Sequence, residues 1–167
     1  MRLIGAPSSF ALELGPVDEV DSGLRTVRVH VAGQVVTGLD TLVYVPHLAD
    51  VLRADAARLR AFPDVDPLFA GRSPVEAFDL LMAGDPAITS AEHCRLSGAC
   101  RFLDWGVSTD HLLGFLIPGP RLLCARRDGA GPLLDTPVTR ADLIDALDTA
   151  AADLSTGYTV FRDRTRA

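Results

Sequence analysis

The side chains best able to do chemistry gather in one stretch of the second half of the chain. His93 and Cys94 are followed by Cys100, and Asp104 and Asp110 flank the turn that comes next. A histidine beside a thiol could supply a base and a nucleophile, and a pair of carboxylates could act in acid–base or metal chemistry. However, the His-Cys-x5-Cys spacing matches no standard zinc site, and a base so close in sequence seldom reaches its nucleophile. The simpler interpretation is buried, reduced thiols and aspartates that accept hydrogen bonds from turn amides.

The common catalytic signatures are absent from the sequence: G-x-G-x-x-G, a Walker loop, H-E-x-x-H and G-x-S-x-G. Cys124 brings the cysteines to 3, an odd number typical of reduced cytosolic thiols. His30, on the polar face of a predicted strand, and His47, beside a proline, are most simply solvated surface residues. We therefore expect no catalytic residues, no metal and no cofactor. A small cytoplasmic enzyme with a Cys/His/Asp site is the alternative.

The charge balance bears on the kind of partner. The chain of 167 residues has 22 acidic and 16 basic residues, a net charge of −6, and all its basic residues are arginine. This balance argues against nucleic-acid binding and is compatible with a basic protein partner. The composition is 48% hydrophobic, yet no window is apolar enough for a membrane helix, and the N-terminus makes a poor secretory signal. We expect a cytoplasmic protein with no membrane contact.

The longest apolar segments predict a central β-hairpin. Residues 112–117 and 122–125 are too short for ordinary helices, and Pro118-Gly119-Pro120 between them can continue neither a helix nor a sheet ladder. Because both segments are apolar on both faces, we expect them in the middle of a sheet, with 101–105 as a shorter strand leading in. Alternating or β-branched segments predict four further strands: 10–14, 26–31, 34–37 and 42–45.

A period of 3.6 residues and capping signals predict the helices. An apolar stripe covers 48–59, Ser73-Pro74-Val75-Glu76 has the pattern of a helix start, and Thr139 can cap a last helix that ends at 155–157. Within the first stripe, Asp55 is either a carboxylate turned into a binding groove or, as we favour, a helix-edge aspartate paired with Arg58 or a neighbouring arginine.

These elements combine into an α+β fold. We expect a single domain over 1–167, with a mainly antiparallel sheet of about five to seven strands and about three helices packed on it. Residues 87–99 give no clear pattern, and 126–137 are expected to form a loop. The tail, 158–167, is expected to fray.

Two acidic groups and the lone tryptophan are the candidate partner-binding residues. One group follows the first predicted strand, and the other forms the outer face of the last helix. For each group the alternative, which we favour, is a solvated surface without a partner. The tryptophan is either a core anchor, which we favour, or a residue that contacts a partner. The candidates are Asp18, Glu19, Asp21, Asp142, Asp145, Asp148 and Trp105.

Three ordered segments carry a resemblance to a known family. The start IGAPSSFALE, 4–13, is similar to I-G-D-x-x-x-F-A-I-E, with Ala6 where Asp is frequent. Residues 68–78 are similar to L-F…S-x-E-E-A-F, and 102–106, FLDWG, to V-F-D-G-W. In this order, with the hairpin and the final helix after them, the segments resemble small immunity proteins of bacterial polymorphic-toxin systems.

The resemblance implies a function without catalysis. Such a protein binds and neutralises a cognate protein toxin, and a basic toxin would be drawn to an acidic inhibitor. The family supplies no set of binding residues to transfer. The apolar composition leaves a structural homodimer of unknown role as a further alternative, so the chain is expected to be a monomer or a homodimer.

Overall fold

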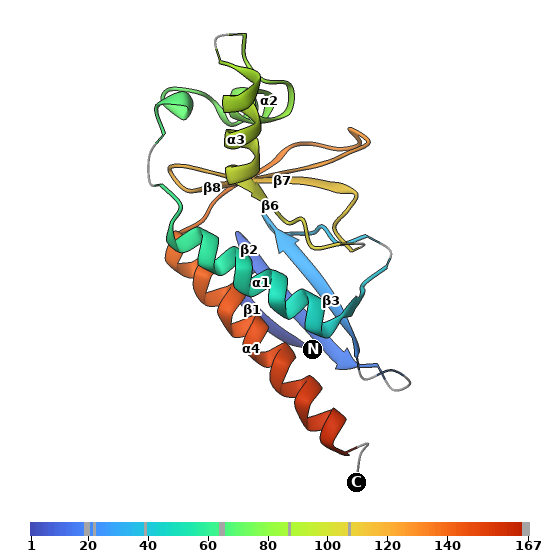
Figure 1. The fold of residues 1–167 in the computed structure, drawn as a ribbon. Coiled ribbons are helices and arrows are strands. Elements are labelled where there is room, and N and C mark those ends of the chain that lie inside the picture. Colours follow the sequence, from blue (N-terminus) through green and yellow to red (C-terminus); the bar gives the residue numbers. More distant parts are fainter. Residues whose placement is uncertain are drawn as a thin grey trace.

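The computed structural model describes residues 1–18, 21, 23–38, 40–63, 66–86, 88–106 and 108–164, with the backbone alone for 159–164. These residues form two antiparallel sheets and four α-helices in one compact domain (Figure 1). The predicted α+β class and antiparallel pairing are confirmed. The strands form two sheets instead of one, and there are four helices instead of about three.

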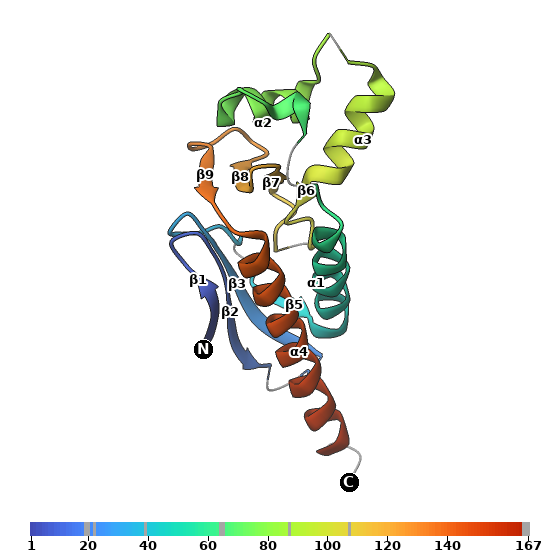
Figure 2. The ribbon, with the colours of Figure 1, turned by 90° about the vertical axis from the view of Figure 1, so that its left-hand side faces the viewer.

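The N-terminal part of the chain builds the first sheet. Its strands follow the order β1-β2-β3-β4, and β5 also pairs with β3. Val27, Val29 and Val31 are buried, as the alternation of the sequence predicts. Two helices, α1 and α4, lie together on this inner side of the sheet (Figure 2). The strands are β1 (Arg2–Ala6), β2 (Phe10–Val17), β3 (Leu24–Val31), β4 (Gln34–Val35) and β5 (Leu42–Tyr44).

The predicted hairpin lies at the centre of the second sheet, whose order is β6-β7-β8-β9. Most of β7 is buried, as expected of a strand covered on both faces. The lead-in strand is shorter than predicted, because Leu103 has a φ of 64° and leaves the extended conformation. The expectation of a loop throughout 126–137 is wrong, since its last four residues pair with β8. The strands are β6 (Arg101–Phe102), β7 (Leu112–Ile117), β8 (Arg121–Arg126) and β9 (Leu134–Pro137).

The helix start predicted at Ser73 is confirmed, whereas the first helix begins at Val45, within the predicted strand 42–45 and ahead of the predicted stripe 48–59. Helix α1 (Val45–Arg60) carries a proline in its first turn, and a short 3-10 turn, η1 (Pro67–Phe69), follows it. Helix α2 (Pro74–Ala83) begins with a capping box between Ser73 and Glu76. Helix α3 (Ser90–Cys100) begins with the same motif, formed by Thr89 and Glu92, in the segment without a clear pattern.

The last helix is longer than predicted. Thr139 accepts a hydrogen bond from the Asp142 N–H at 3.0 Å, which confirms the N-terminal cap. Helix α4 (Arg140–Arg164) then continues through the predicted stop at 155–157, so that prediction is wrong. The hydroxyls of Ser155 and Thr156 donate to carbonyls one turn earlier, at 2.8 and 2.9 Å, and so bond within the helix instead of ending it. The helical backbone therefore includes 158–164 of the expected tail.

Three aromatic rings connect the two sheets. Phe10 of β2 lies 5.7 Å from Phe102 of β6 and 6.2 Å from Trp105, and the last two rings are 5.6 Å apart, all edge to face. Trp105 is only 4% exposed, so it anchors the core and has no surface to offer a partner. Its burial confirms the core interpretation.

A partly buried carboxylate joins this aromatic cluster to the helices. Asp55 of α1 accepts a hydrogen bond from Trp105 Nε1 at 2.8 Å and pairs with Arg58 at 3.0 Å. Arg58 in turn donates to the carbonyl of Ala99, near the end of α3, at 2.6 Å. The predicted Asp55–Arg58 pair is confirmed, and it holds α1, α3 and the segment after β6 together.

Candidate functional site

Two of the side chains that could have formed a Cys/His/Asp site, His93 and Asp104, contact other groups. His93 contacts the Leu81 carbonyl oxygen of α2 through Nε2 at 3.1 Å, and Asp104 pairs with Arg101 at 3.0 Å. Cys94 is exposed, and no described interaction joins it to either residue. No group of three His, Cys, Asp or Glu side chains within the described ranges could hold a metal ion.

The buried thiols are poorly suited to nucleophilic attack. Burial raises the pKa of Cys100 to about 12, and the nearby Asp66 carboxylate adds to the effect. Burial likewise raises the pKa of Cys124 to about 11. Because the thiolate is the reactive form, both residues stay protonated and unreactive at neutral pH.

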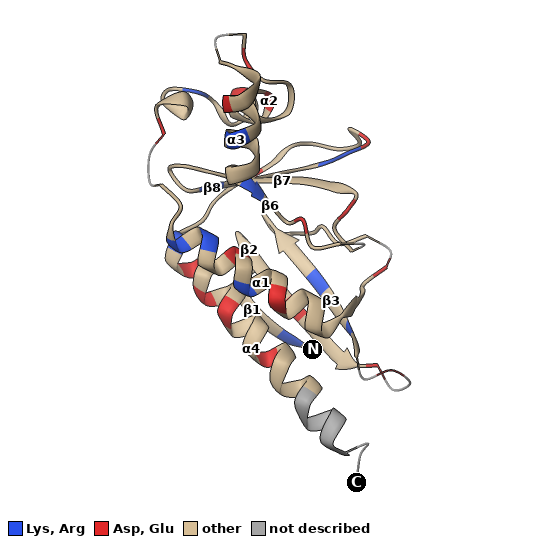
Figure 3. Ribbon diagram, in the orientation of Figure 1, with Lys and Arg blue, Asp and Glu red and all other residues tan. Residues whose placement is uncertain are grey.

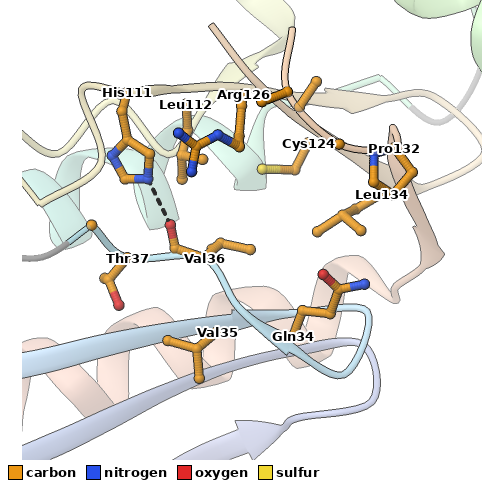
Figure 4. Close-up of a pocket in the computed structure, with 14 residues that line it drawn as sticks. Gln34, Val35, Val36, Thr37, His111, Leu112, Cys124, Arg126, Pro132 and Leu134 are labelled. Atoms are coloured by element: carbon orange, nitrogen blue, oxygen red, sulfur yellow. Dashed lines mark hydrogen bonds between the residues drawn. The ribbon is translucent and has the colours of Figure 1, made fainter. Parts of the chain in front are cut away.

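A cavity of about 370 Å³ lies between the two sheets (Figure 4). Cys124 belongs to the apolar wall of this cavity, and His111 and Arg126 also line the cavity. The protein already engages two of the polar groups in the lining: His111 Nε2 lies 3.0 Å from the Val36 carbonyl oxygen, and Arg126 makes two hydrogen bonds to Asp128 at 2.7 and 3.1 Å. A third, the Thr37 hydroxyl, is buried without a hydrogen-bond partner among the described residues. The described lining therefore resembles a gap between packed sheets more than an assembled reaction centre.

The first predicted acidic group holds a tight turn. The Asp18 carboxylate accepts a hydrogen bond from the Asp21 N–H at 2.9 Å, and the Asp21 carboxylate accepts one from the Gly23 N–H at 2.8 Å. Glu19, the third member, lies outside the described residues. These two aspartates therefore have a structural role in the turn between β2 and β3.

The second predicted acidic group divides between two roles. Asp148 forms an ion pair with Arg60 at the end of α1, so it helps to fasten the two helices. Figure 3 shows acidic residues along α4 and arginines on the neighbouring α1. Asp142 and Asp145, one turn apart near the start of α4, are exposed. Asp148 is less exposed as a residue, although its side chain remains 43% exposed beside Arg60.

Asp142 and Asp145 line a second cavity, of about 270 Å³, which we call the acidic cleft. Its other wall is the turn between β1 and β2, which brings residues far apart in the sequence to one place. Apolar side chains that are buried in the core line its base, whereas the two carboxylates belong to exposed residues. The lining residues are Gly5, Ala6, Ser9, Phe10, Val138, Thr139, Asp142, Leu143, Asp145 and Ala146.

This arrangement suits a long basic side chain. The aliphatic stem of a lysine or arginine gains by contact with apolar surface, while its charged end needs a carboxylate or water. The acidic cleft offers both, because its apolar base lies next to Asp142 and Asp145.

Sequence reasoning found the two aspartates but not the wall opposite them. Gly5 lies in that wall with a φ of 93°, and a Cβ there would come within 2.6 Å of the Phe10 carbonyl oxygen. Only glycine fits such a position without strain. The signal that could have found this wall is the I-G-x-x-x-x-F start, whose glycine and phenylalanine both line the cleft.

Within the described residues, no helix is both long and apolar enough to cross a membrane. Comparison of the chain with protein-family models, with curated proteins and with solved structures finds no match.

Proposed function

We propose that this protein is a non-catalytic immunity-type protein, which binds and neutralises a cognate toxin domain of a bacterial polymorphic-toxin system. The observation that carries the proposal is the acidic cleft, where exposed Asp142 and Asp145 lie next to an apolar base. A basic side chain of the toxin inserts there, with its stem against the base and its charge on the carboxylates.

The family-like segments support this proposal through their places in the fold. The start 4–13 supplies one wall of the acidic cleft, and its Phe10 packs on Phe102 and Trp105 of the FLDWG segment. Two segments far apart in the sequence thus build one unit, with the cleft at its surface. Ala6 lines the cleft where the family often has Asp, so in this chain the acidic charge comes from α4.

The charge of the chain supports the same kind of partner. With a net charge of −6, it attracts a basic domain before contact, as many nuclease toxins with basic substrate clefts would be attracted. Salt screens this attraction, so the association rate should fall as ionic strength rises.

The proposal predicts a toxin gene beside the gene for this protein. The experiment is to express that toxin with and without this protein, and to look for a complex by gel filtration. Wild-type protein should restore growth and co-elute with the toxin. If growth is unchanged and no complex elutes, the proposed function is wrong.

A pair of variants tests the cleft itself. Asp142→Arg/Asp145→Arg reverses the charge beside the cleft, and Asp50→Arg/Asp104→Arg changes the net charge equally at exposed residues elsewhere. We expect the first variant to lose protection and the second to keep it. Equal protection by both variants would show that the toxin docks on another surface.

A further inference from the structure

The outer face of the first sheet has no covering layer among the described elements. In Figure 2, α1 and α4 lie on the other side of β1, β2 and β3. Most of the exposed large apolar side chains in the described part of the chain lie on this face: Met1, Leu3, Val35, Leu42 and Tyr44. A group of this kind on one sheet face is typical of a protein contact.

The strand register places the apolar residues at the two margins of the face. Leu3 of β1 pairs with Glu13 of β2, so both point outward on one side of the sheet. On the far margin, Val35 pairs with His30, and Leu42 pairs with Thr26. Register partners share a face, so the outer surface has an apolar margin along β1 and another along β4 and β5.

The centre of the face is charged. Glu13 of β2 is the register partner of Arg28 of β3, and their charged atoms lie 3.8 Å apart. The Glu13 carboxylate also lies 3.1 Å from His30 Nε2. The face therefore carries a negative group on one central strand and a positive group at the same level on the next.

We propose that a second copy of this chain packs on the outer face, through a two-fold axis that runs parallel to the strands between β2 and β3. This axis places β2 of one copy over β3 of the other, so each Glu13 lies opposite the other copy's Arg28. The alternative two-fold axis, perpendicular to the strands, would place β2 on β2 and β3 on β3, so that no Glu13 would lie opposite an Arg28. The charge pattern therefore selects the first arrangement.

The apolar margins fit the same arrangement. With β1 over the partner's β4 and β5, Met1 and Leu3 meet the margin that carries Leu42, and Val35 meets Gly5, which has no side chain. The result is an aligned packing of two sheets, a common way to cover an open sheet face. The dimer contact uses neither carboxylate of the acidic cleft, and among the residues named for it only Gly5 also borders the cleft, so the contact does not depend on the proposed function.

Light scattering across a wide range of protein concentration tests the dimer. The wild-type chain should approach twice the monomer mass of 17.8 kDa. Leu3→Glu and Leu42→Glu should each shift the mass toward the monomer, whereas Val75→Glu, at an exposed residue of α2, should not. Circular dichroism checks that each variant is folded, and having two interface positions keeps the test valid if one variant is not.

Charge reversal tests the axis. Glu13→Arg alone and Arg28→Glu alone each place like charges opposite one another, and should raise the dissociation constant about tenfold or more. The double variant Glu13→Arg/Arg28→Glu restores opposite charges and should restore the dimer. A monomer at every concentration, or a double variant no tighter than the singles, would overturn the proposal. If the wild-type chain is monomeric and Leu3→Glu abolishes neutralisation of the toxin, the occupant of the face is the toxin and the dimer is wrong.

Discussion

Replacing Asp55 by alanine tests the network that joins the helices to the aromatic cluster. The Asp55 carboxylate is mostly buried, at 17% exposed, and it accepts the indole N–H of Trp105 at 2.8 Å. A hydrogen bond to a charged group stabilises by about 1.5–3 kcal/mol, and a buried N–H left without an acceptor costs about 1–3 kcal/mol. These two free energies partly describe the same lost hydrogen bond, so they do not add in full. Loss of the partly exposed pair with Arg58 adds about 0–1 kcal/mol. We expect Asp55→Ala to lower the free energy of unfolding by about 2–4 kcal/mol.

The same helix provides a matched control. Asp50 pairs with Arg53 at 3.0 Å with the same i,i+3 spacing, but its side chain is 79% exposed. Both alanine variants gain the same helix propensity, so the difference between them isolates the buried contacts. Asp50→Ala should change the free energy of unfolding by less than about 0.5 kcal/mol. Asp55→Asn, which keeps an acceptor for the indole but loses the charge, should fall between the two.

The assay is equilibrium unfolding in urea, followed by far-ultraviolet circular dichroism and by the fluorescence of the lone tryptophan. The two probes should give the same midpoint if unfolding is two-state. If Asp55→Ala and Asp50→Ala differ by less than about 0.5 kcal/mol, the network contributes nothing to stability and the reasoning is refuted.

Three further predictions follow from packing and burial. A Cβ at Gly114 of β7 would come within 2.5 Å of a backbone carbonyl of β6, whereas one at Gly98 of α3 meets nothing within 4 Å. Gly114→Ala should therefore destabilise the protein by about 1–3 kcal/mol, and Gly98→Ala should stabilise it by up to about 1 kcal/mol. A melting temperature higher for Gly114→Ala than for Gly98→Ala would refute this packing. Iodoacetamide at neutral pH should label exposed Cys94 alone in the folded protein and all three cysteines after denaturation; fast labelling of Cys100 would contradict its burial. Burial raises the pKa of Cys100 to about 12 and of Cys124 to about 11 from 9.0, so the unfolded chain loses these protons first and stability should fall as pH rises from 9 toward 12. Urea titrations over this pH range should show a smaller fall in the free energy of unfolding for Cys100→Ala/Cys124→Ala than for the wild-type chain. An equal fall would show that the two buried thiols do not cause the pH dependence.

The local signals in the sequence were reliable where they depend on neighbouring residues. The serine cap of α2, the threonine cap of α4 and the Pro-Gly-Pro turn of the β7–β8 hairpin each act within a few positions. Helix α3 carries an equally clear capping box, but its buried residues are few, Leu96 and Cys100, so no apolar stripe marked it. Strand β9 was missed because it contains a proline and a charged residue, which an edge strand tolerates.

The arrangement of the elements depends on pairings that the sequence does not mark. Strand periodicity shows which face of a strand is buried but not which strand lies beside it. The sequence therefore predicts a single sheet where the structure has two. The acidic cleft has the same origin: the helical period identified Asp142 and Asp145, but the wall opposite them comes from the far end of the chain. The pairing of Asp148 with Arg60 likewise depends on how α4 packs against α1.

Hydrogen exchange of the protein alone and with its neighbouring toxin domain tests the central proposal most directly. If the acidic cleft receives the toxin, backbone amides of the β1–β2 turn and of the start of α4 should exchange more slowly in the complex. The turn between β2 and β3 should be unchanged. Unchanged exchange at the cleft, with or without protection elsewhere, would contradict the proposed mode of neutralisation.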